Sequence, residues 1–306
     1  MSSRKIHVKA PVPLPIRDGV APSYMWLNDV DSARTLAYLV ARFPDVGEGT
    51  WLNRMARGEV VDGAGKRLSP DTELLRGERV WYYREIDAEP RIPFDEIILF
   101  QDRHLLVVDK PHFLPTIPGG RFLHESLLVR LKKKLGEAQL VPIHRLDRET
   151  AGVVLFSLRE ESRGAYQSLF QERSVEKEYE ALAAPLPQRQ FPFIHRSRMV
   201  DGTPFFRMQE EEGEPNSETL VDVIEEKDGV ALYRLQPHTG RKHQLRVHMA
   251  SIGAPIMNDA FYPDARPEQA DDFTRPLKLL ARAIAFDDPL SGERRRFESA
   301  RTLYSV

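Results

Sequence analysis

The sequence predicts an α+β fold with a mixed, largely antiparallel sheet, preceded by a small separate module. Short apolar or alternating strands are interspersed with single helices and hairpins, rather than with regular βαβ units. The chain has 306 residues, which is enough for one large domain and one small domain. Hydrophobic residues make up 41% of the chain and charged residues 29%, a composition typical of soluble globular proteins.

Composition also limits the chemistry. The chain has no cysteine, which excludes disulfides, thiolate catalysis and cysteine zinc sites. No apolar run approaches the ~20 residues that span a bilayer, and the first residues do not resemble a signal peptide, so we expect a cytoplasmic protein. The net charge is −2, but basic residues gather at 185–208 and acidic residues at 210–228. This segregation indicates either a local RNA-binding face or ordinary solvated surfaces.

The first part of the chain is predicted to be an extended segment followed by a small module. Residues 1–31 contain several prolines and little periodicity, which predicts a Pro-rich lead-in. Residues 32–88 are predicted to form two short helices, a strand with a tight turn, and a closing strand. These elements are expected at 32–43, 51–57, 60–65 and 77–83.

Residues 89–306 are predicted to form the large domain. Its strands are expected at 97–100, 105–110, 153–157, 175–182, 219–225 and 230–236. Its helices are expected at 126–135, 160–172 and 242–252. Gly136 and Gly253 follow the first and last of these helices, at the position where glycine commonly ends a helix.

The most informative segment is His-Arg-Leu-Asp-Arg-Glu-Thr-Ala-Gly at 144–152, which leads directly into an apolar run. It places Asp147 between Arg145 and Arg148 on a turn that opens into a buried strand. Such an arrangement is typical of a site that holds a charged carboxylate near a polyanion. Taken alone, the same pattern also fits a structural carboxylate that pairs with an arginine.

Four further segments accompany this turn. Residues 239–249 read Thr-Gly-Arg-Lys-His-Gln-Leu-Arg-Val-His-Met, follow a strand and open a helix. Residues 254–259 read Ala-Pro-Ile-Met-Asn-Asp. Residues 177–179 read Lys-Glu-Tyr, and residues 279–283 read Leu-Leu-Ala-Arg-Ala.

Together these segments closely resemble the ordered motifs of the RluA-type pseudouridine synthases, over about residues 95–290. The resemblance implies that Asp147 is the nucleophile attacking a target uridine in RNA, that Arg246 forms a salt bridge with it, and that Tyr179 lies against the uracil. It also implies that Arg145 replaces the extruded base in the RNA stack. Arg148, Arg241, Lys177 and His243 are the other expected RNA contacts.

The resemblance implies an isomerase that acts on ribosomal or transfer RNA, or both, without a metal or redox cofactor and without an obligate protein partner. Residues 32–86 resemble, more weakly, the alpha-L RNA-binding module, although a structural αβ cap fits them equally well. Two departures are visible. Arg282 stands where the family usually has histidine, and residues 111–118 differ from the usual glycine-containing loop.

Other functions fit parts of the same pattern. An RNA-binding protein that lost catalysis would need none of Asp147, Tyr179 and Arg246. A glycoside or nucleoside hydrolase would need a second carboxylate, for which Glu149 and Asp259 are candidates. We expect no zinc site built from His238, His243 and His248, because positions five residues apart do not share a helix face.

Overall fold

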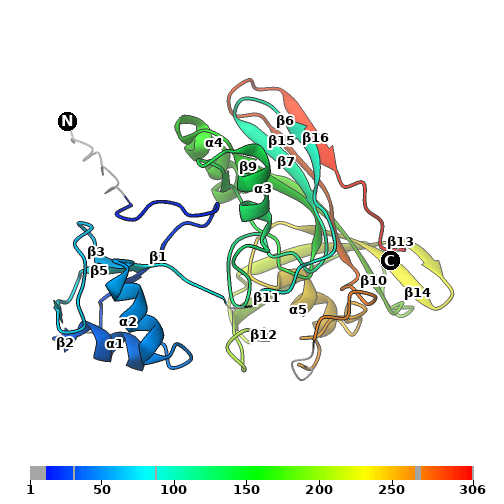
Figure 1. Cartoon of the computed structure of the whole chain (residues 1–306). Helices are drawn as coiled ribbons and strands as arrows, with labels where there is room; N and C mark the ends of the chain where they lie inside the picture. The colour runs from blue at the N-terminus through cyan, green and yellow to red at the C-terminus, as the bar shows by residue number, and fades with distance from the viewer. Residues whose placement is uncertain (1–11, 30–31, 87, 266–269, 305–306) are drawn as a thin grey trace, which may run out of the picture. The chain divides into compact units, whose positions relative to one another are not determined.

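The computed structural model describes residues 12–29, 32–86, 88–265 and 270–304. They form two compact units, one up to Glu89 and one from Pro90 onward (Figure 1). No helix among these residues has the length and apolar composition needed to cross a membrane. The predicted mixed, largely antiparallel α+β fold is confirmed.

The first unit contains a three-stranded and a two-stranded antiparallel sheet and two helices. Its strands are β1 (Ser23–Trp26), β2 (Ala33–Arg34), β3 (Val60–Asp62), β4 (Glu73–Leu74) and β5 (Arg79–Tyr82). Its helices are α1 (Thr35–Arg42) and α2 (Glu48–Ala56). The three-stranded sheet has the order β1-β5-β3, and β2 pairs with β4. The predicted lead-in therefore supplies an edge strand to the unit. Trp51 on α2 is fully buried among apolar side chains from both helices and the sheet.

The second unit is built on one 11-stranded sheet. Its strands are β6 (Ile97–Gln101), β7 (Leu105–Lys110), β8 (Val141–Pro142), β9 (Ala151–Ser157), β10 (Glu176–Ala183), β11 (Phe193–Asp201), β12 (Met208–Glu211), β13 (Ser217–Lys227), β14 (Val230–Pro237), β15 (Leu279–Asp287) and β16 (Arg294–Glu298). The main order is β12-β11-β13-β14-β10-β15-β9-β7-β6, with β8 on β9 and β16 on β15. Of the pairings described, β9 with β15 is parallel and the rest are antiparallel.

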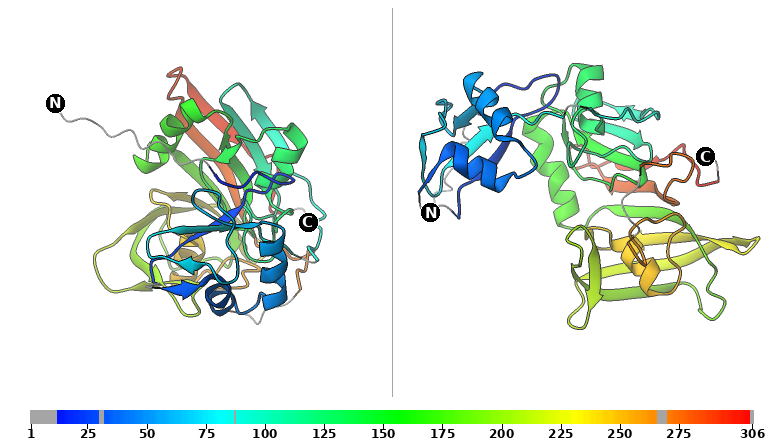
Figure 2. Two further views of the ribbon diagram at one scale, coloured as in Figure 1. Left: turned by 60° about the vertical axis from the view of Figure 1, so that its left-hand side comes forward. Right: turned by 60° about the horizontal axis from the view of Figure 1, so that its bottom comes forward.

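Three helices cover this sheet: α3 (Leu127–Leu135), α4 (Glu160–Gln171) and α5 (Gln244–Ser251). The first two pack on opposite faces of β7 and β9. Leu131 of α3 contacts the cluster that contains Val154, whereas Tyr166 of α4 belongs to the cluster of Val153. This explains why β7 and β9 are apolar and buried throughout, as expected for strands covered on both faces. Helix α5 packs against the other half of the sheet (Figure 2).

The start of β9 requires glycine. Gly152 has φ +115°, and a Cβ at this position would lie 2.2 Å from the carbonyl oxygen of Ala281 on β15. The backbones of these strands therefore approach too closely for any other residue. The pairing joins Ala151 to Leu280 and Gly152 to Ala281, which fixes where the preceding loop leaves the sheet.

Candidate active site

The loop at 143–150 joins β8 to β9 and carries Asp147. Thr116 fixes its middle, because the hydroxyl donates to the Leu146 carbonyl at 2.9 Å and accepts from the Leu146 amide at 3.2 Å. The Asp147 carbonyl accepts from the Thr150 amide at 3.2 Å, which closes a turn. These contacts hold the loop although it has no regular secondary structure.

Lys110 supports the same loop from inside the protein. It is completely buried, and its Nζ donates to the carbonyls of Pro111 at 3.0 Å, Leu114 at 2.7 Å and Arg148 at 3.1 Å. Burial lowers the pKa of Lys110 to about 7, against the opposing influence of Glu149 and Asp147. Sequence reasoning did not identify Lys110 or Thr116 as part of the site. A lysine at the end of the apolar strand 105–109 is a signal that could have identified it.

Arg246 on α5 lies beside Asp147. Its Nε and Nη2 donate to the two oxygens of buried Asp259, at 2.8 and 2.6 Å. Its Nη1 lies 3.5 Å from Oδ2 of Asp147 and 3.8 Å from Oε2 of Glu149. This Nη1 is buried and makes no hydrogen bond within the described chain. Burial acts to lower the pKa of Arg246, but the hydrogen bonds to Asp259 outweigh it and the pKa is raised.

Asp259 is fully committed to this pair. Its side chain is buried, and its Oδ1 also accepts from the amides of Phe261 at 2.8 Å and Tyr262 at 3.2 Å. Both oxygens are thus occupied by donors from within the protein, and Asp259 is not among the residues that line the pocket beside Asp147. Asp259 therefore does not supply the second carboxylate that a hydrolase would need.

A pocket of about 430 Å³ opens beside Asp147. It is lined by residues from the predicted motifs, namely His144, Arg145, Asp147, Lys177, Tyr179, Arg241, His243 and Arg246, together with other residues of β14, β15, α4 and the loops. His243 lies 3.8 Å from Asp147, measured from Nε2 to Oδ2, and its Nδ1 shares a hydrogen bond with the Tyr262 hydroxyl at 2.9 Å. Segments that are far apart in sequence thus meet at one cavity.

Tyr179 on β10 is partly buried in this pocket. Burial raises the pKa of its hydroxyl, and the nearby charge of Asp147 raises it further. The phenol therefore keeps its proton at neutral pH. It can donate a hydrogen bond or a proton, but it is a poor general base.

The remaining predicted RNA contacts fall into two groups. Arg145 and Arg241 are exposed at the pocket, and Arg145 forms no ion pair within the described part of the chain. Arg148 lies outside the residues that line the pocket and binds Asp271 through Nη1 and Nη2, at 3.1 and 2.5 Å. An RNA contact by Arg148 remains a prediction.

Lys177 is held at the pocket wall by its Nζ, which donates to the Thr239 carbonyl at 3.0 Å. Burial lowers the pKa of Lys177 to about 8, with a smaller contribution from Arg173. Between pH 8 and the unfolded value near 10.5, the unfolded chain then binds more protons at this position. The contribution of Lys177 to the free energy of unfolding should therefore increase with pH in this window.

This dependence can be isolated with Lys177→Met. The free energy of unfolding of the native chain relative to the variant should rise between pH 8 and 10, by at most about 1.4 kcal/mol per pH unit. Urea unfolding of both proteins at several pH values measures the difference. A difference that does not change with pH would contradict a lowered Lys177 pKa.

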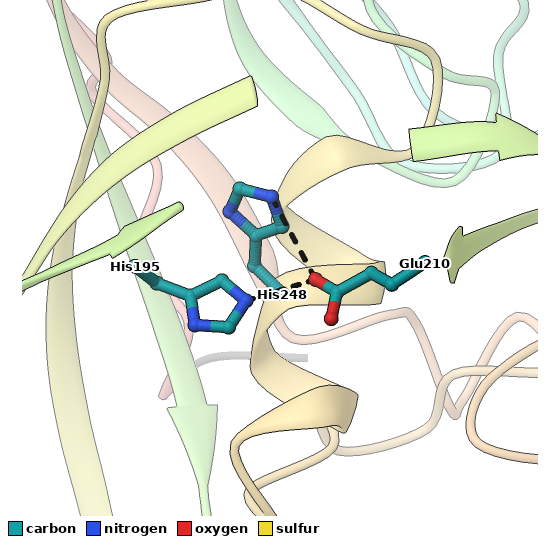
Figure 3. Close-up of side chains that lie close together, drawn as sticks. All are labelled: His195, Glu210 and His248. Atoms are coloured by element: carbon teal, nitrogen blue, oxygen red, sulfur yellow. Dashed lines mark hydrogen bonds and ion pairs between the residues drawn. The ribbon is translucent and has the colours of Figure 1, made fainter. Parts of the chain in front are cut away.

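Away from the pocket, His195, Glu210 and His248 meet between β11, β12 and α5 (Figure 3). Nε2 of His195 lies 2.8 Å from Oε1 of Glu210, and Nε2 of His248 lies 3.9 Å from the same oxygen. The three ligand atoms lie within 4.8 Å of one another, a spacing that could hold a metal ion. His248 belongs to this cluster, whereas His238 and His243 line the pocket beside Asp147.

The atoms of this cluster also have hydrogen-bond partners within the protein. The His248 ring nitrogens share hydrogen bonds with Ser217 at 2.9 Å and with Thr219 at 2.9 Å. Burial lowers the pKa of His248 to about 4, so the ring is neutral at neutral pH. The hydrogen bonds of this cluster thus join the β11–β12 hairpin to α5.

Arg282, which departs from the family pattern, has a structural role. It binds both oxygens of Glu180 on β10, at 2.8 and 2.7 Å. Its Nη1 also donates to the carbonyls of Ser299 and Arg301, at 2.8 Å each. It joins β15 to β10 and to the C-terminal segment, and it does not line the pocket.

Comparison with known proteins gives a consistent result. The sequence model of the RNA pseudouridylate synthase family matches residues 104–251. The dual-specificity RNA pseudouridine synthase RluA of Escherichia coli K12 is 34% identical, over 66% of this chain and 92% of the relative. An uncharacterized RNA pseudouridine synthase of Synechocystis is 28% identical, over 69% and 73%. The solved structure of human RNA pseudouridylate synthase domain containing 1 matches with a TM-score of 0.57 and 25% identity, over 70% and 86%.

Proposed function

The chain belongs to the RluA-type RNA pseudouridine synthases, which isomerise uridine in RNA, and we propose that it does so with Asp147 as nucleophile on an extruded uridine of ribosomal or transfer RNA. One observation carries the assignment of Asp147. Its carboxylate lies 3.5 Å from a buried nitrogen of Arg246 that makes no hydrogen bond within the described chain, at a pocket of about 430 Å³.

The reaction requires no net change of atoms. The bond between N1 of uracil and the ribose carbon breaks, the base turns within the pocket, and C5 bonds to the same carbon. The proton on C5 is then lost and N1 takes up a proton, so the product has the composition of the substrate. A carboxylate can serve this chemistry by adding to the sugar or base, or by removing a sugar proton. Arg246 supports the negative charge of Asp147, since its own charge is fixed by Asp259.

Entry of the base requires that it leave the RNA stack, which costs a few kcal/mol. Arg145 is the residue we assign to the vacated position, because it is exposed at the pocket and has no carboxylate partner in the described chain. Arg241, Lys177 and His243 would contact the flanking RNA. Contacts of this kind predict that RNA affinity falls with increasing salt.

The choice of RNA rests on similarity. The relatives from Escherichia coli and Salmonella are named dual-specificity enzymes, and this chain shares about a third of their residues. We therefore infer ribosomal RNA, transfer RNA or both as the substrate, and a cytoplasmic location. Tritium release from C5-labelled, unmodified transcripts of each RNA tests the proposal. Absence of release from both would contradict it.

Tyr179 should contribute through its hydroxyl. Tyr179→Phe keeps the ring against the base and removes the proton donor, so we expect the single-turnover rate to fall by about 10²-fold. RNA affinity should change little, because stacking remains. A rate equal to that of the native chain would show that Tyr179 acts through its ring alone.

A further inference from the structure

The first unit presents aromatic side chains on one face of its small sheet. In the antiparallel pair β1–β5, Tyr24 lies opposite Trp81, and Trp26 lies opposite Arg79. Residues directly opposite one another, and residues two apart on a strand, share a face of the sheet. Tyr24, Trp26, Arg79 and Trp81 therefore form one continuous surface, called here the aromatic face.

Part of this face is open to solvent. Tyr24 is 51% exposed and Trp26 is 46% exposed, which is unusual for large aromatic side chains. At the other end the chain covers its own apolar surface, where Leu14 packs on Trp81 and Tyr83. The contrast shows that the described lead-in buries one end of the face and leaves Tyr24 and Trp26 uncovered.

The uncovered end carries a positive charge. The Arg79 guanidinium lies 4.1 Å from the ring centre of Trp26 and 5.6 Å from that of Tyr24. Within the described ranges, Arg79 forms no ion pair with a carboxylate. A cation held by rings, without an anionic partner in the protein, is suited to bind an anion that approaches the same surface.

A hollow of about 340 Å³ adjoins Trp26, Arg79 and Trp81. Its wall includes Gly63 and Gly77, and a Cβ built on either glycine would meet no atom within 4 Å. Two carboxylates, Asp62 and Glu78, also line the hollow. The Oδ1 of Asp62 accepts from the amides of Ala64 and Lys66, at 2.8 and 2.9 Å. The backbone at these turns is therefore open to a flat ligand.

We propose that Tyr24, Trp26 and Arg79 form a stacking platform for unpaired bases of the substrate RNA, outside the uridine pocket. This rests on the proposed function, which makes RNA the ligand. Aromatic faces bind any base, and an adjacent arginine binds the phosphate that follows it. This alternation of ring and cation favours single-stranded RNA over a protein partner, whose contact would bury the rings without requiring an unpaired guanidinium.

Equilibrium RNA binding tests the platform. It would be measured in the Asp147→Asn background, which prevents turnover, with a single-stranded oligonucleotide and with a folded transcript that has unpaired flanks. Trp26→Ala should weaken binding by roughly tenfold, and Arg79→Gln should weaken it and reduce its salt dependence. Tyr304→Ala is the matched control, since Tyr304 is 63% exposed and lies in the other unit.

Tryptophan fluorescence adds a direct readout. The chain has three tryptophans, and RNA should quench part of their emission in a way that Trp26→Ala removes. Equal affinity of the Trp26→Ala, Arg79→Gln and Tyr304→Ala proteins would overturn the proposal. If these two platform variants instead abolished self-association in sedimentation and left RNA affinity intact, the face would be a protein contact and the proposal would also fail.

The test of the platform and the test of the proposed function can fail independently of each other. Tritium release is measured on the native chain, whereas platform binding is measured without turnover. If the native protein releases tritium but RNA affinity does not depend on Trp26, the platform proposal fails and the proposed reaction stands. If RNA binding depends on Trp26 but no transcript releases tritium, the platform proposal stands and the proposed reaction fails.

Discussion

Asp147→Asn should lower the single-turnover rate of pseudouridine formation by about three orders of magnitude or more. The amide has the shape of the carboxylate, so the loop held by Thr116 and Lys110 should not change. It has neither the charge nor the nucleophilicity that the reaction needs. Tritium release from C5-labelled RNA at saturating enzyme measures the rate.

Asp222→Asn provides the matched control. Asp222 lies on β13, its side chain is 33% exposed, and its partner is Arg234 at 3.8 Å, so the same substitution there should leave the rate unchanged. Equal rates for the Asp147→Asn and native proteins would reject Asp147 as the nucleophile. They would leave the isomerase function in place.

Asp259→Asn should have the second-largest effect, on stability as well as on activity. It removes the negative charge that balances buried Arg246 and replaces one accepting oxygen by an amide nitrogen, which should cost about 3 kcal/mol of unfolding free energy. Loss of the contacts with Asp259 should also let the Nη1 atom of Arg246 move away from Asp147. A displacement of this kind predicts a rate loss of about 10²-fold. Urea unfolding and single-turnover kinetics measure the two effects.

A double variant separates the two roles of the pair. Arg246→Met combined with Asp259→Leu replaces the buried ion pair by apolar side chains, which should recover part of the stability lost in Asp259→Asn. Activity should stay low, because Asp147 then has no cation beside it. Recovery of both stability and activity would show that Arg246 has only a structural role.

Sequence patterns predicted the elements that depend on local signals. The strands at β7 and β9, the helices α3 and α4, and the turn that carries Asp147 follow from apolar runs, helical spacing and glycine stops. Helix α5 was expected from Lys242 but begins at Gln244, because His243 has a positive φ of 55°. A left-handed residue at the helix start is not visible in a pattern of apolar positions.

Other features depend on distant parts of the chain. Strand β1 is four residues long and is stabilised by β5, more than fifty residues later, so its local pattern carried little information. Strands β11 and β12 appeared only as a basic and an acidic segment, since β12 is the edge strand of the sheet and β11 is next to it. The buried contacts of Lys110 and the Arg246–Asp259 pair likewise arise from tertiary packing.

In the candidate active site, too, some features were predicted from the sequence and others depend on tertiary packing. The motif order placed Asp147, Tyr179 and Arg246 in one function, and the three residues line one pocket. The protonated state of Tyr179 and the commitment of Asp259 to Arg246 could not be read from the motifs, because both depend on burial. These two facts support the proposed role of Tyr179 as a proton donor and argue against Asp259 as a second catalytic carboxylate.

The most direct test of isomerisation at Asp147 is the nucleoside content of one RNA before and after treatment. Digestion and chromatography should show pseudouridine appearing in equal amount to the uridine lost, with native protein and not with Asp147→Asn. The RNA should release no free uracil, because the base returns to the same sugar. Free uracil without pseudouridine would contradict the account and identify a hydrolase.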